Sequence, residues 1–361
     1  MNKNRKSLIK KLIIGAIIVL LLVAALWFGL RFFEDRFKAD EDQFGDHGDW
    51  GNEEVMPEET VLSIGDMDMI YTDQVKTYLI MGTDNTGKAD PTGQHGDMAD
   101  FMLLLMINNT RGTYGFVQLD RDTMTDVTVI DEKGEELGTT EEQLCIAHWY
   151  GGTDELRNQN TVDTVSYLMG YLPIDGYFTL QMKDIAAFNN AIGGVVVTIN
   201  GDLTKLDPEF EDGAEVLITD DKVEKFVRAR QGVGEGTNKE RMARQRQYMD
   251  AVYSRTMNQL REAPDYIDTL YGDLKDIIQS NVSSKEVSQI ATAIRSMDNL
   301  GFMELPGTSK EGDTLGDGII HAEFYLNDDS VYTTLRKIIK FTAVNDTSVE
   351  EDTEETDEED R

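Results

Sequence analysis

The stretch Phe101-Met-Leu-Leu-Leu-Met-Ile107 constrains the fold of this chain more than any other feature of its sequence. Every residue in it is apolar, and the run is too short for an ordinary helix. A strand with one face in water alternates apolar and polar residues, whereas a continuous apolar run is expected for a strand covered on both faces. The stretch therefore predicts a central sheet with a packed layer on each side.

The rest of the chain alternates between strand and helix signals. Short apolar runs predict strands at 76–81, 101–107, 114–119, 177–180, 195–199, 302–305 and 321–326. Helical spacing and caps predict helices at 139–150, 161–171, 182–191, 220–230, 238–262, 265–280, 284–298 and 330–341. Strands that alternate with helices indicate an α/β fold with a mixed central sheet sandwiched by helices.

The N-terminus carries a second apolar run, Leu12–Leu30, which is 19 residues long and uncharged. At 1.5 Å per residue it would span the roughly 30 Å hydrocarbon core of a membrane. Residues 1–11 are basic and should stay in the cytoplasm under the positive-inside rule. We expect a single-pass anchor over residues 12–33, in the cell membrane, with the rest of the protein extracellular. A cleaved signal peptide is the alternative, but the run is long for one and no small-residue cleavage site follows.

Two acidic segments flank the expected extracellular α/β domain over residues 73–345. We expect residues 34–72 to form a stalk or linker and residues 346–361 a disordered tail. The chain has 68 acidic and 34 basic residues, for a net charge of −34. Because nucleic-acid binding depends on neutralising phosphates with Lys and Arg, this balance argues against a nucleic-acid partner. The alternative is that the bulk acidity only keeps the protein soluble.

The single cysteine, Cys145, excludes an internal disulfide. No histidine follows it in a recognisable cysteine-enzyme pattern, so we expect it to be a small buried hydrophobic residue.

Two aspartates lie at predicted strand ends and are candidate metal ligands. Asp84 follows the strand at 76–81, and Asp100 directly precedes the apolar strand. Paired carboxylates make a hard-oxygen site of the kind that Mg²⁺ prefers, with phosphate oxygens completing the shell. The alternative for each aspartate is the simpler role of capping a turn or a helix.

Arginines are unusually dense in two short segments of this acidic chain. Arg121 lies between Asp120 and Asp122 where a predicted strand ends. The others are Arg228 and Arg230 in Val227-Arg-Ala-Arg230, and Arg241, which shares a helix face with Gln245. Arginine forks suit phosphate oxygens. Pairing with the abundant acidic residues is the alternative.

The order of these motifs resembles the LytR-CpsA-Psr family of membrane-anchored cell-wall proteins. The resemblance covers residues 76–260 and rests on LIMGTD (79–84), DMADFMLL (97–104), LDRDT (119–123), AHWYGG (147–152), the block at 175–199, VRAR (227–230) and NKERMARQRQ (238–247). No single motif is specific, but their order after one N-terminal anchor is.

The resemblance implies a transferase that moves an anionic glycopolymer, such as teichoic acid or capsule, from polyprenyl pyrophosphate to peptidoglycan. It implies Mg²⁺ as cofactor on Asp84 and Asp100. It implies pyrophosphate binding by Arg121, Arg228, Arg230, Arg241 and Gln245, with Arg121 and Asp122 as the catalytic pair, Asp122 either orienting Arg121 or taking a proton. Asp120 is expected to face solvent. The polyprenyl chain would occupy an apolar tunnel that Phe101 and residues 185–188 help to line, although such residues are also ordinary core.

The sequence departs from the family pattern at several positions. Met98 replaces a usual arginine, an arginine after the first aspartate is absent, Gln143-Leu-Cys145 replaces Lys-Ile-Asn, and Asn238-x-Glu240-Arg241 replaces Asp-x-Gly-Arg. Two alternatives stay open: a non-catalytic protein that binds polyprenyl lipid or wall polymer, and a polyprenyl pyrophosphatase. A membrane-tethered transcription regulator is disfavoured, because about eleven cytoplasmic residues are too few for a DNA-binding domain.

Overall fold

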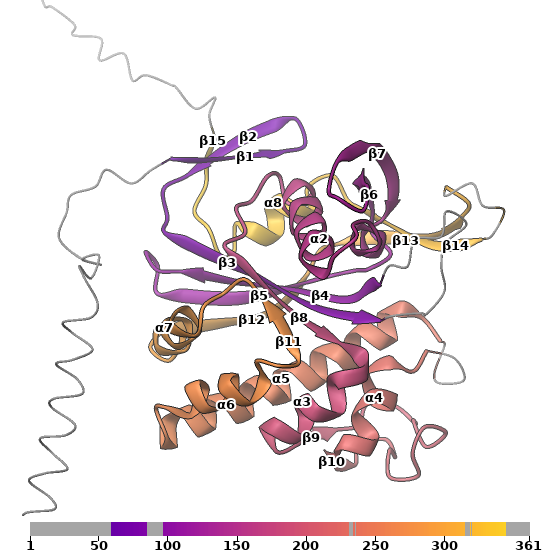
Figure 1. Ribbon diagram of the computed structural model, residues 1–361, viewed down its shortest axis with the longest axis vertical. Coiled ribbons are helices and arrows are strands. Elements are labelled where there is room, and N and C mark those ends of the chain that lie inside the picture. Colours follow the sequence, from indigo (N-terminus) through magenta and orange to yellow (C-terminus); the bar gives the residue numbers. More distant parts are fainter. Residues whose placement is uncertain are drawn as a thin grey trace, which may run out of the picture. The chain divides into compact units, whose positions relative to one another are not determined.

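The centre of the fold is a mixed sheet of six strands (Figure 1). The computed structural model describes residues 59–84, 97–230, 234, 236–314, 318 and 320–343. In spatial order the strands of this sheet are β11 (Ile278–Ser280), β8 (Gly176–Gln181), β3 (Val75–Asp84), β4 (Met98–Asn108), β5 (Thr113–Leu119) and β12 (Asp298–Glu304). The pairs β3–β8 and β5–β12 are parallel and the other three are antiparallel. The predicted mixed α/β fold is confirmed.

The apolar strand β4 is covered on both faces, as its sequence predicted. Leu104 and Met106 belong to one hydrophobic cluster, and Leu103 and Leu105 belong to another. Because successive side chains of a strand point to opposite faces, one continuous apolar run serves two cores.

The first face carries α2 (Asp154–Leu168) and α8 (Ser330–Leu335), whose Val165 and Leu335 are fully buried against the sheet. The same half of the molecule holds two antiparallel strand pairs: β1 (Thr60–Ile64) with β2 (Met67–Tyr71), and β6 (Met124–Ile130) with β7 (Glu136–Gln143). A further hairpin joins β13 (Gly307–Gly312) to β14 (His321–Leu326), and the short β15 (Thr342–Ala343) pairs with β2.

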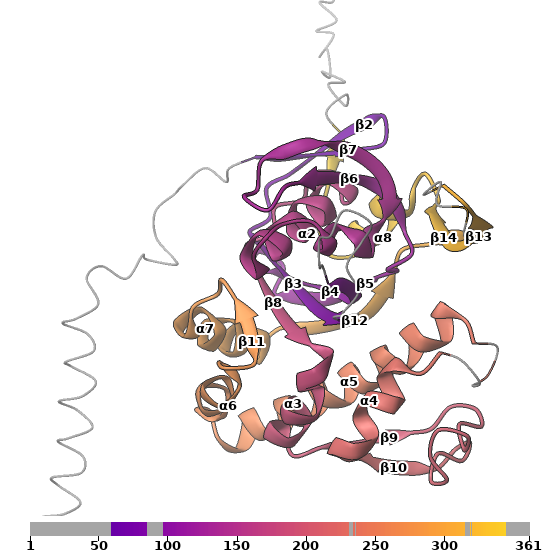
Figure 2. The same ribbon diagram turned by 45° about the vertical axis from the view of Figure 1, so that its right-hand side comes forward.

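The other face carries the helical layer, which lies below the sheet in Figures 1 and 2. It contains α3 (Ile185–Ile192), α4 (Asp220–Arg228), α5 (Asn238–Glu262), α6 (Tyr266–Leu274) and α7 (Ser284–Ile294), with the hairpin of β9 (Val195–Thr198) and β10 (Glu215–Ile218). The long helix α5 begins where the Thr237 side chain accepts a hydrogen bond from the Glu240 backbone. Its Tyr253 packs against the rings of Tyr114 and Phe116 on β5.

Three sequence expectations are corrected by the structure. Residues 139–143, expected to open a helix, belong to strand β7, and a 3₁₀-helix (Leu144–Trp149) follows. The expected stalk over 34–72 does not hold for residues 60–71, which form the β1–β2 hairpin because Leu62 and Tyr71 are buried in the core. The expected helix at 265–280 ends at Leu274, and residues 278–280 form β11.

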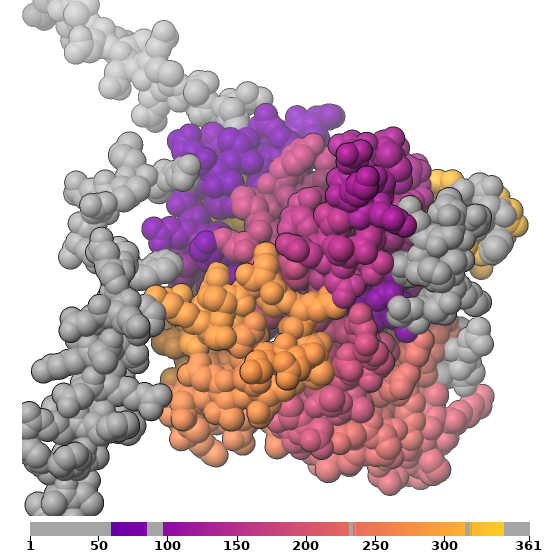
Figure 3. Space-filling model, in the orientation of Figure 1, coloured from indigo at the N-terminus to yellow at the C-terminus, as the bar shows by residue number. Residues whose placement is uncertain are grey.

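The expected anchor at 12–33 and the tail at 346–361 lie outside the described residues. Within the part of the chain that is described, none of the helices has both the length and the apolar character needed to cross a bilayer. The described residues all belong to one compact unit. Figure 3 shows the orange C-terminal helices α6 and α7 in direct contact with the middle of the chain, and α6 packs on α3. The described part of the chain is therefore a single α/β domain.

Candidate functional site

The predicted site residues of three neighbouring strands meet at one edge of the central sheet. Strand β3 ends on Asp84, and β4 begins beside it, with Asp84 opposite Met98 in the antiparallel register. Strand β5 ends at Leu119, opposite Met102, so Arg121 emerges next to the beginning of β4. A register shift between Gly82 and Thr83 marks the same edge. The topology thus brings together groups that are far apart in sequence.

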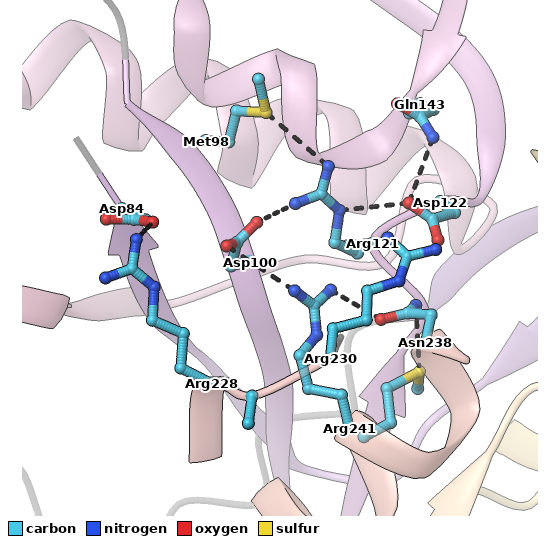
Figure 4. Close-up of polar contacts among 12 residues, drawn as sticks. Asp84, Met98, Asp100, Arg121, Asp122, Gln143, Arg228, Arg230, Asn238 and Arg241 are labelled. Atoms are coloured by element: carbon cyan, nitrogen blue, oxygen red, sulfur yellow. Dashed lines mark hydrogen bonds and ion pairs between the residues drawn. The ribbon is translucent and has the colours of Figure 1, made fainter. Parts of the chain in front are cut away.

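Asp100 lies between two arginines (Figure 4). Its Oδ1 forms an ion pair with Nη1 of Arg121, and its Oδ2 lies 3.8 Å from Nη1 of Arg241. All three side chains are largely buried, with exposed fractions of 13%, 16% and 7% in that order. Because buried charges are retained only when they are paired, this trio is held in place by its own electrostatics.

Arg121 is fixed by a second carboxylate and by two residues where the sequence departs from the family pattern. Its Nε donates to Oδ1 of Asp122 at 3.1 Å, and that oxygen also accepts from Nε2 of Gln143 at 3.1 Å. The thioether sulfur of Met98 accepts from Nη2 of Arg121 at 3.7 Å. Gln143 and Met98 therefore hold the guanidinium in position. Their departure from the family pattern was the only sequence signal of this role.

Asp120 does not face solvent as expected. It is half-buried, and its Oδ1 accepts from Nδ2 of Asn238 at 2.6 Å and from the backbone of Asp122 at 2.9 Å. Oδ1 of Asn238 in turn accepts from Arg241 at 2.6 Å. Burial is the largest effect and, with the nearby carboxylate of Asp122, it raises the pKa of Asp120, whereas these hydrogen bonds and the charge of Arg241 lower it. The net pKa is about 6. The correction follows from the packing of α5 over the end of β5, which strand-end patterning alone does not report.

The other predicted residues lie closer to the surface. Arg228, at the last position of α4, forms ion pairs with Asp84 and, at 2.9 Å, with Glu224. The side chain of Arg228 is 45% exposed and that of Asp84 is 17% exposed. Arg230 is exposed, and its Nε donates to the carbonyl of Gly236 at 3.3 Å. The site therefore has a buried part around Asp100 and an exposed part around Arg228 and Arg230.

Positive charge is crowded around Arg241. Burial lowers the pKa of Arg241; Asp100 opposes that change, and the guanidinium groups of Arg121 and Arg230 reinforce it. The Nε of Arg241 is buried and has no hydrogen-bond partner among the described residues. An orphaned buried donor among mutually repelling cations indicates a place where an anion would be stabilised.

Arg244 lies on the same helix as Arg241, but its guanidinium bonds to the end of α4. It is buried, its Nε donates to the carbonyl of Phe226 at 3.0 Å, and its Nη2 donates to that of Ala229. It fixes the end of α4 and so positions Arg228. Cys145 is also structural, because full burial raises the pKa of its thiol to about 12.

An apolar cavity of about 110 Å³ adjoins the charged edge, between the sheet and α3, α4 and α5. It is lined by Phe101, Ile185 and Phe188, the residues named from the sequence as tunnel candidates. Gln245, one helical turn beyond Arg241, also lines it and is buried. The structure thus places Gln245 at the boundary between the charged groups and the apolar space.

Asp84 and Asp100 offer carboxylate oxygens at adjoining strand ends, the donor type that Mg²⁺ prefers. Across the described residues, no group of three or more His, Cys, Asp and Glu side chains could hold a metal ion. Mg²⁺ is commonly bound by one or two carboxylates with phosphate and water oxygens. The pair therefore fits magnesium when a phosphate-bearing ligand supplies the other oxygens.

Comparison with known proteins places these motifs in a family. A sequence model described as the LytR_cpsA_psr family matches residues 52–336. The teichoic acid transferase TagU of Halalkalibacterium halodurans, named as acting between polyisoprenyl-teichoic acid and peptidoglycan, is 28% identical over 158 residues. That match covers 44% of this chain and 47% of TagU, so the chain spans about half the length of this relative.

Solved structures share the fold. Bacillus subtilis TagV superposes with a TM-score of 0.52 at 17% identity, over 73% of this chain and 97% of TagV. A structure of TagT bound to LI-WTA gives a TM-score of 0.53 at 19% identity, over 73% of this chain and 89% of that one. At these identities the likeness concerns the fold alone.

Proposed function

The chain belongs to the LytR_cpsA_psr family, and on that basis we propose that it is a transferase of cell-wall assembly. In this proposal it moves an anionic glycopolymer from polyprenyl pyrophosphate to peptidoglycan. The observation that carries it is the convergence of Arg121 and Arg241 on Asp100, beside an apolar cavity, in a protein whose net charge is −34. A charged lipid carrier needs both kinds of environment side by side.

The arginines would bind and orient the pyrophosphate. Arg121 is held by Asp122, Gln143 and Met98, so its fork needs little reorganisation when charge develops on the phosphoryl oxygens. Such preorganised donors are a large part of the catalysis of phosphoryl transfer. Both oxygens of Asp100 are already engaged by arginine, which supports a positioning role for this aspartate as well as a metal-binding one.

Mg²⁺ is proposed as the cofactor, with Asp84 and Asp100 as the residues that would hold it. When bound, it would neutralise the charge of the pyrophosphate oxygens. The arginines would then act on the phosphate charge that remains. Asp122 is proposed to orient Arg121, since one of its oxygens is shared by Arg121 and Gln143.

The apolar cavity is proposed to accept the polyprenyl chain next to the pyrophosphate. Its volume of about 110 Å³ is below the roughly 300–1,000 Å³ of typical ligand pockets. A long chain would therefore require the helices α3 and α5 to separate further from the sheet. The basic residues 1–11 and the apolar run 12–30 support a single-pass membrane anchor, with the domain outside the cell, close to such a lipid.

The proposal is tested by measuring polyprenyl phosphate release from a polyprenyl pyrophosphate-linked saccharide by the full chain in detergent. The reaction is run with Mg²⁺, with a chelator, and with and without peptidoglycan. Magnesium-dependent release that requires peptidoglycan and is lost in Asp100→Ala would support it. Arg255→Ala is the matched control, because Arg255 lies on the same helix but donates to the carbonyl of Ile192.

Two other outcomes would point to the alternative functions. Release without any acceptor would indicate a pyrophosphatase. Saturable binding of the lipid with no release at any magnesium concentration would indicate a non-catalytic binding protein. Either result would overturn the proposed transfer.

A further inference from the structure

A second cavity borders the charged cluster on the side away from the apolar one. The apolar cavity contacts β8, β3 and β4, whereas this second cavity, of about 530 Å³, contacts β5 and β12, the next strands across the sheet. Both cavities border α5. Arg121 lies just after β5, and Asp100 lies near the beginning of the neighbouring strand β4. The charged cluster of Asp100, Arg121 and Arg241 therefore lies between an apolar cavity and a polar one.

The lining of this polar cavity combines aromatic rings with hydrogen-bonding groups. Phe302 and Phe324 supply the rings, and Gln118, Asp120 and Glu304 supply amide and carboxylate oxygens. The size is within the range of about 300–1,000 Å³ that small-ligand pockets occupy. A sugar ring suits such a lining, because its C–H face can pack on an aromatic ring while its hydroxyls bond to carboxylates and amides. Gln118 and Glu304 are both held by Arg246 on α5, so their oxygens are fixed in position at the cavity wall.

Among the residues that line the polar cavity, Asp120 is the closest in sequence to Arg121. Its two carboxylate oxygens differ in their hydrogen bonds. Its Oδ1 accepts both hydrogen bonds, from Asn238 at 2.6 Å and from the backbone of Asp122 at 2.9 Å. Within the described residues, no hydrogen bond reaches its Oδ2. The carboxylate is thus held firmly through one oxygen while the other remains free to accept a proton.

Asp122 is less suited to the same task. It is only 4% exposed, and its Oδ1 is shared by Arg121 and Gln143. Protonation of Asp122 would weaken its ion pair with Arg121 at the moment when that arginine has to stabilise charge. Asp120 carries no such ion pair with Arg121 among the described residues.

We propose that the polar cavity binds a sugar ring of the acceptor glycan, and that Asp120 is the general base for its attacking hydroxyl. This inference rests on the proposed transfer function and names the acceptor side of the same site. The hydroxyl oxygen forms a bond to the phosphorus nearer the glycopolymer, and the bond from that phosphorus to the bridging oxygen breaks. The hydroxyl proton goes to Oδ2 of Asp120, and the electron pair of the broken bond leaves with polyprenyl phosphate.

The pKa of Asp120 matches this role. A general base works best when its pKa lies close to the working pH, and burial raises the pKa of Asp120 to about 6. The transfer rate should therefore rise with pH through about 6 as Asp120 loses its proton.

The test uses the full chain in detergent, with a polyprenyl pyrophosphate-linked saccharide as donor and soluble uncrosslinked peptidoglycan oligomers as acceptor. Rates are measured from pH 4.5 to 8 for wild type, Asp120→Asn, Phe324→Leu and the control Asp250→Asn. Asp250 is exposed on α5, away from both cavities.

For Asp120→Asn we expect kcat for transfer to fall by about 10²-fold, the size of a lost general base. We also expect the rise near pH 6 to disappear and the donor KM to stay unchanged. For Phe324→Leu we expect the acceptor KM to rise about tenfold with little change in kcat.

An unchanged acceptor KM in Phe324→Leu, or an unchanged pH profile in Asp120→Asn, would overturn the inference while leaving the transferase function intact. If wild type releases no polyprenyl phosphate, the proposed function fails. Calorimetry of peptidoglycan oligomer binding then tests the proposed sugar site separately. Binding that weakens in Phe324→Leu but not in Asp250→Asn would support the sugar site. Absence of binding to wild type would overturn it.

Discussion

The two parts of the charged cluster use the same residue types in different surroundings. In the buried part, Asp100 is enclosed by Arg121 and Arg241, and each side chain is less than one-fifth exposed. In the exposed part, Asp84 pairs with Arg228, which is nearly half exposed. Burial makes an ion pair costly to form and rigid once formed, whereas solvent screens a surface pair and leaves it mobile. We infer that the buried part is shaped for the transition state and the exposed part for initial capture of the anion.

The largest effect is expected from a substitution in the buried part of the cluster. Arg121→Ala should lower kcat for donor cleavage by about 10²–10³-fold, the usual size for loss of a preorganised donor to a developing anion. The donor KM should change much less, because an interaction made mainly in the transition state affects kcat. The measurement is the steady-state rate of polyprenyl phosphate release at saturating donor.

Arg121→Lys separates charge from geometry. A lysine keeps the positive charge but cannot contact Asp100, Asp122 and the donor with one planar fork, so it should recover only a small part of the lost rate. Arg255→Ala serves as the control for general damage to the fold. A rate close to wild type in Arg121→Ala would remove the distinction between the two parts of the cluster.

The next effect concerns stability. Burial raises the pKa of Asp120 from 3.8 to about 6, so the folded protein binds more protons than the unfolded chain between these values. The contribution of Asp120 to the free energy of unfolding is therefore fully present below pH 4 and is lost as pH rises through about 6. A difference of this size corresponds to about 2–3 kcal/mol of the free energy of unfolding.

Asp120→Asn should remove that dependence. Its amide oxygen can still accept the backbone hydrogen bond of Asp122, and it carries no charge to desolvate. The measurement is urea unfolding of the full chain at pH 4, 5, 6 and 7. The free energy of unfolding of the variant should increase relative to that of wild type as pH rises. A constant difference between the two proteins across this range would show that Asp120 titrates normally. An exposed carboxylate, Asp250, provides the comparison.

The sequence predicted the centre of this fold well because its strands are marked by local composition. The continuous run at 101–107 identified a strand covered on both faces, and the helix predicted at 182–191 ends at Gly193, whose φ is 78°. Strand β7 was mistaken for a helix because residues 139–143 are all polar, and they contain a pattern that usually caps helices. For a surface hairpin, pairing with β6 decides the structure, and that information is not local.

The site could be predicted as a set of residues but not as an arrangement. Strand ends placed Asp84, Asp100 and Arg121 at one edge, which the topology confirms. The sequence did not reveal that Arg241 shares Asp100 with Arg121, since this depends on how α5 packs over the sheet. For the same reason the polar cavity was missed: its walls come from β5, β12, β14 and α5, which are distant in the chain.

A third prediction sharpens the comparison through magnesium. If Asp84 and Asp100 hold the ion together, Asp84→Asn and Asp100→Asn should each raise the magnesium concentration for half-maximal activity by about tenfold or more, since Mg²⁺ is bound by few protein ligands. Asp100→Asn should also lower kcat at saturating magnesium, because it releases Arg121 and Arg241. Excess magnesium should restore the activity of Asp84→Asn almost fully. Equal magnesium dependence in both variants and wild type would exclude this pair as the ligands.

The smallest expected effect belongs to the exposed arginine. Arg228→Ala removes one surface pair with Asp84 and one with Glu224, and exposed pairs contribute about 0–1 kcal/mol. We expect the donor KM to rise by roughly threefold to fivefold with kcat nearly unchanged, since a screened charge aids encounter more than reaction. This KM difference from wild type should shrink when the reaction is run in about 0.5 M salt, where the Debye length falls below ~5 Å. Arg121→Ala should keep its defect in the same salt, because its partners are buried. A loss of kcat in Arg228→Ala comparable to that in Arg121→Ala would mean that burial does not divide the cluster by task.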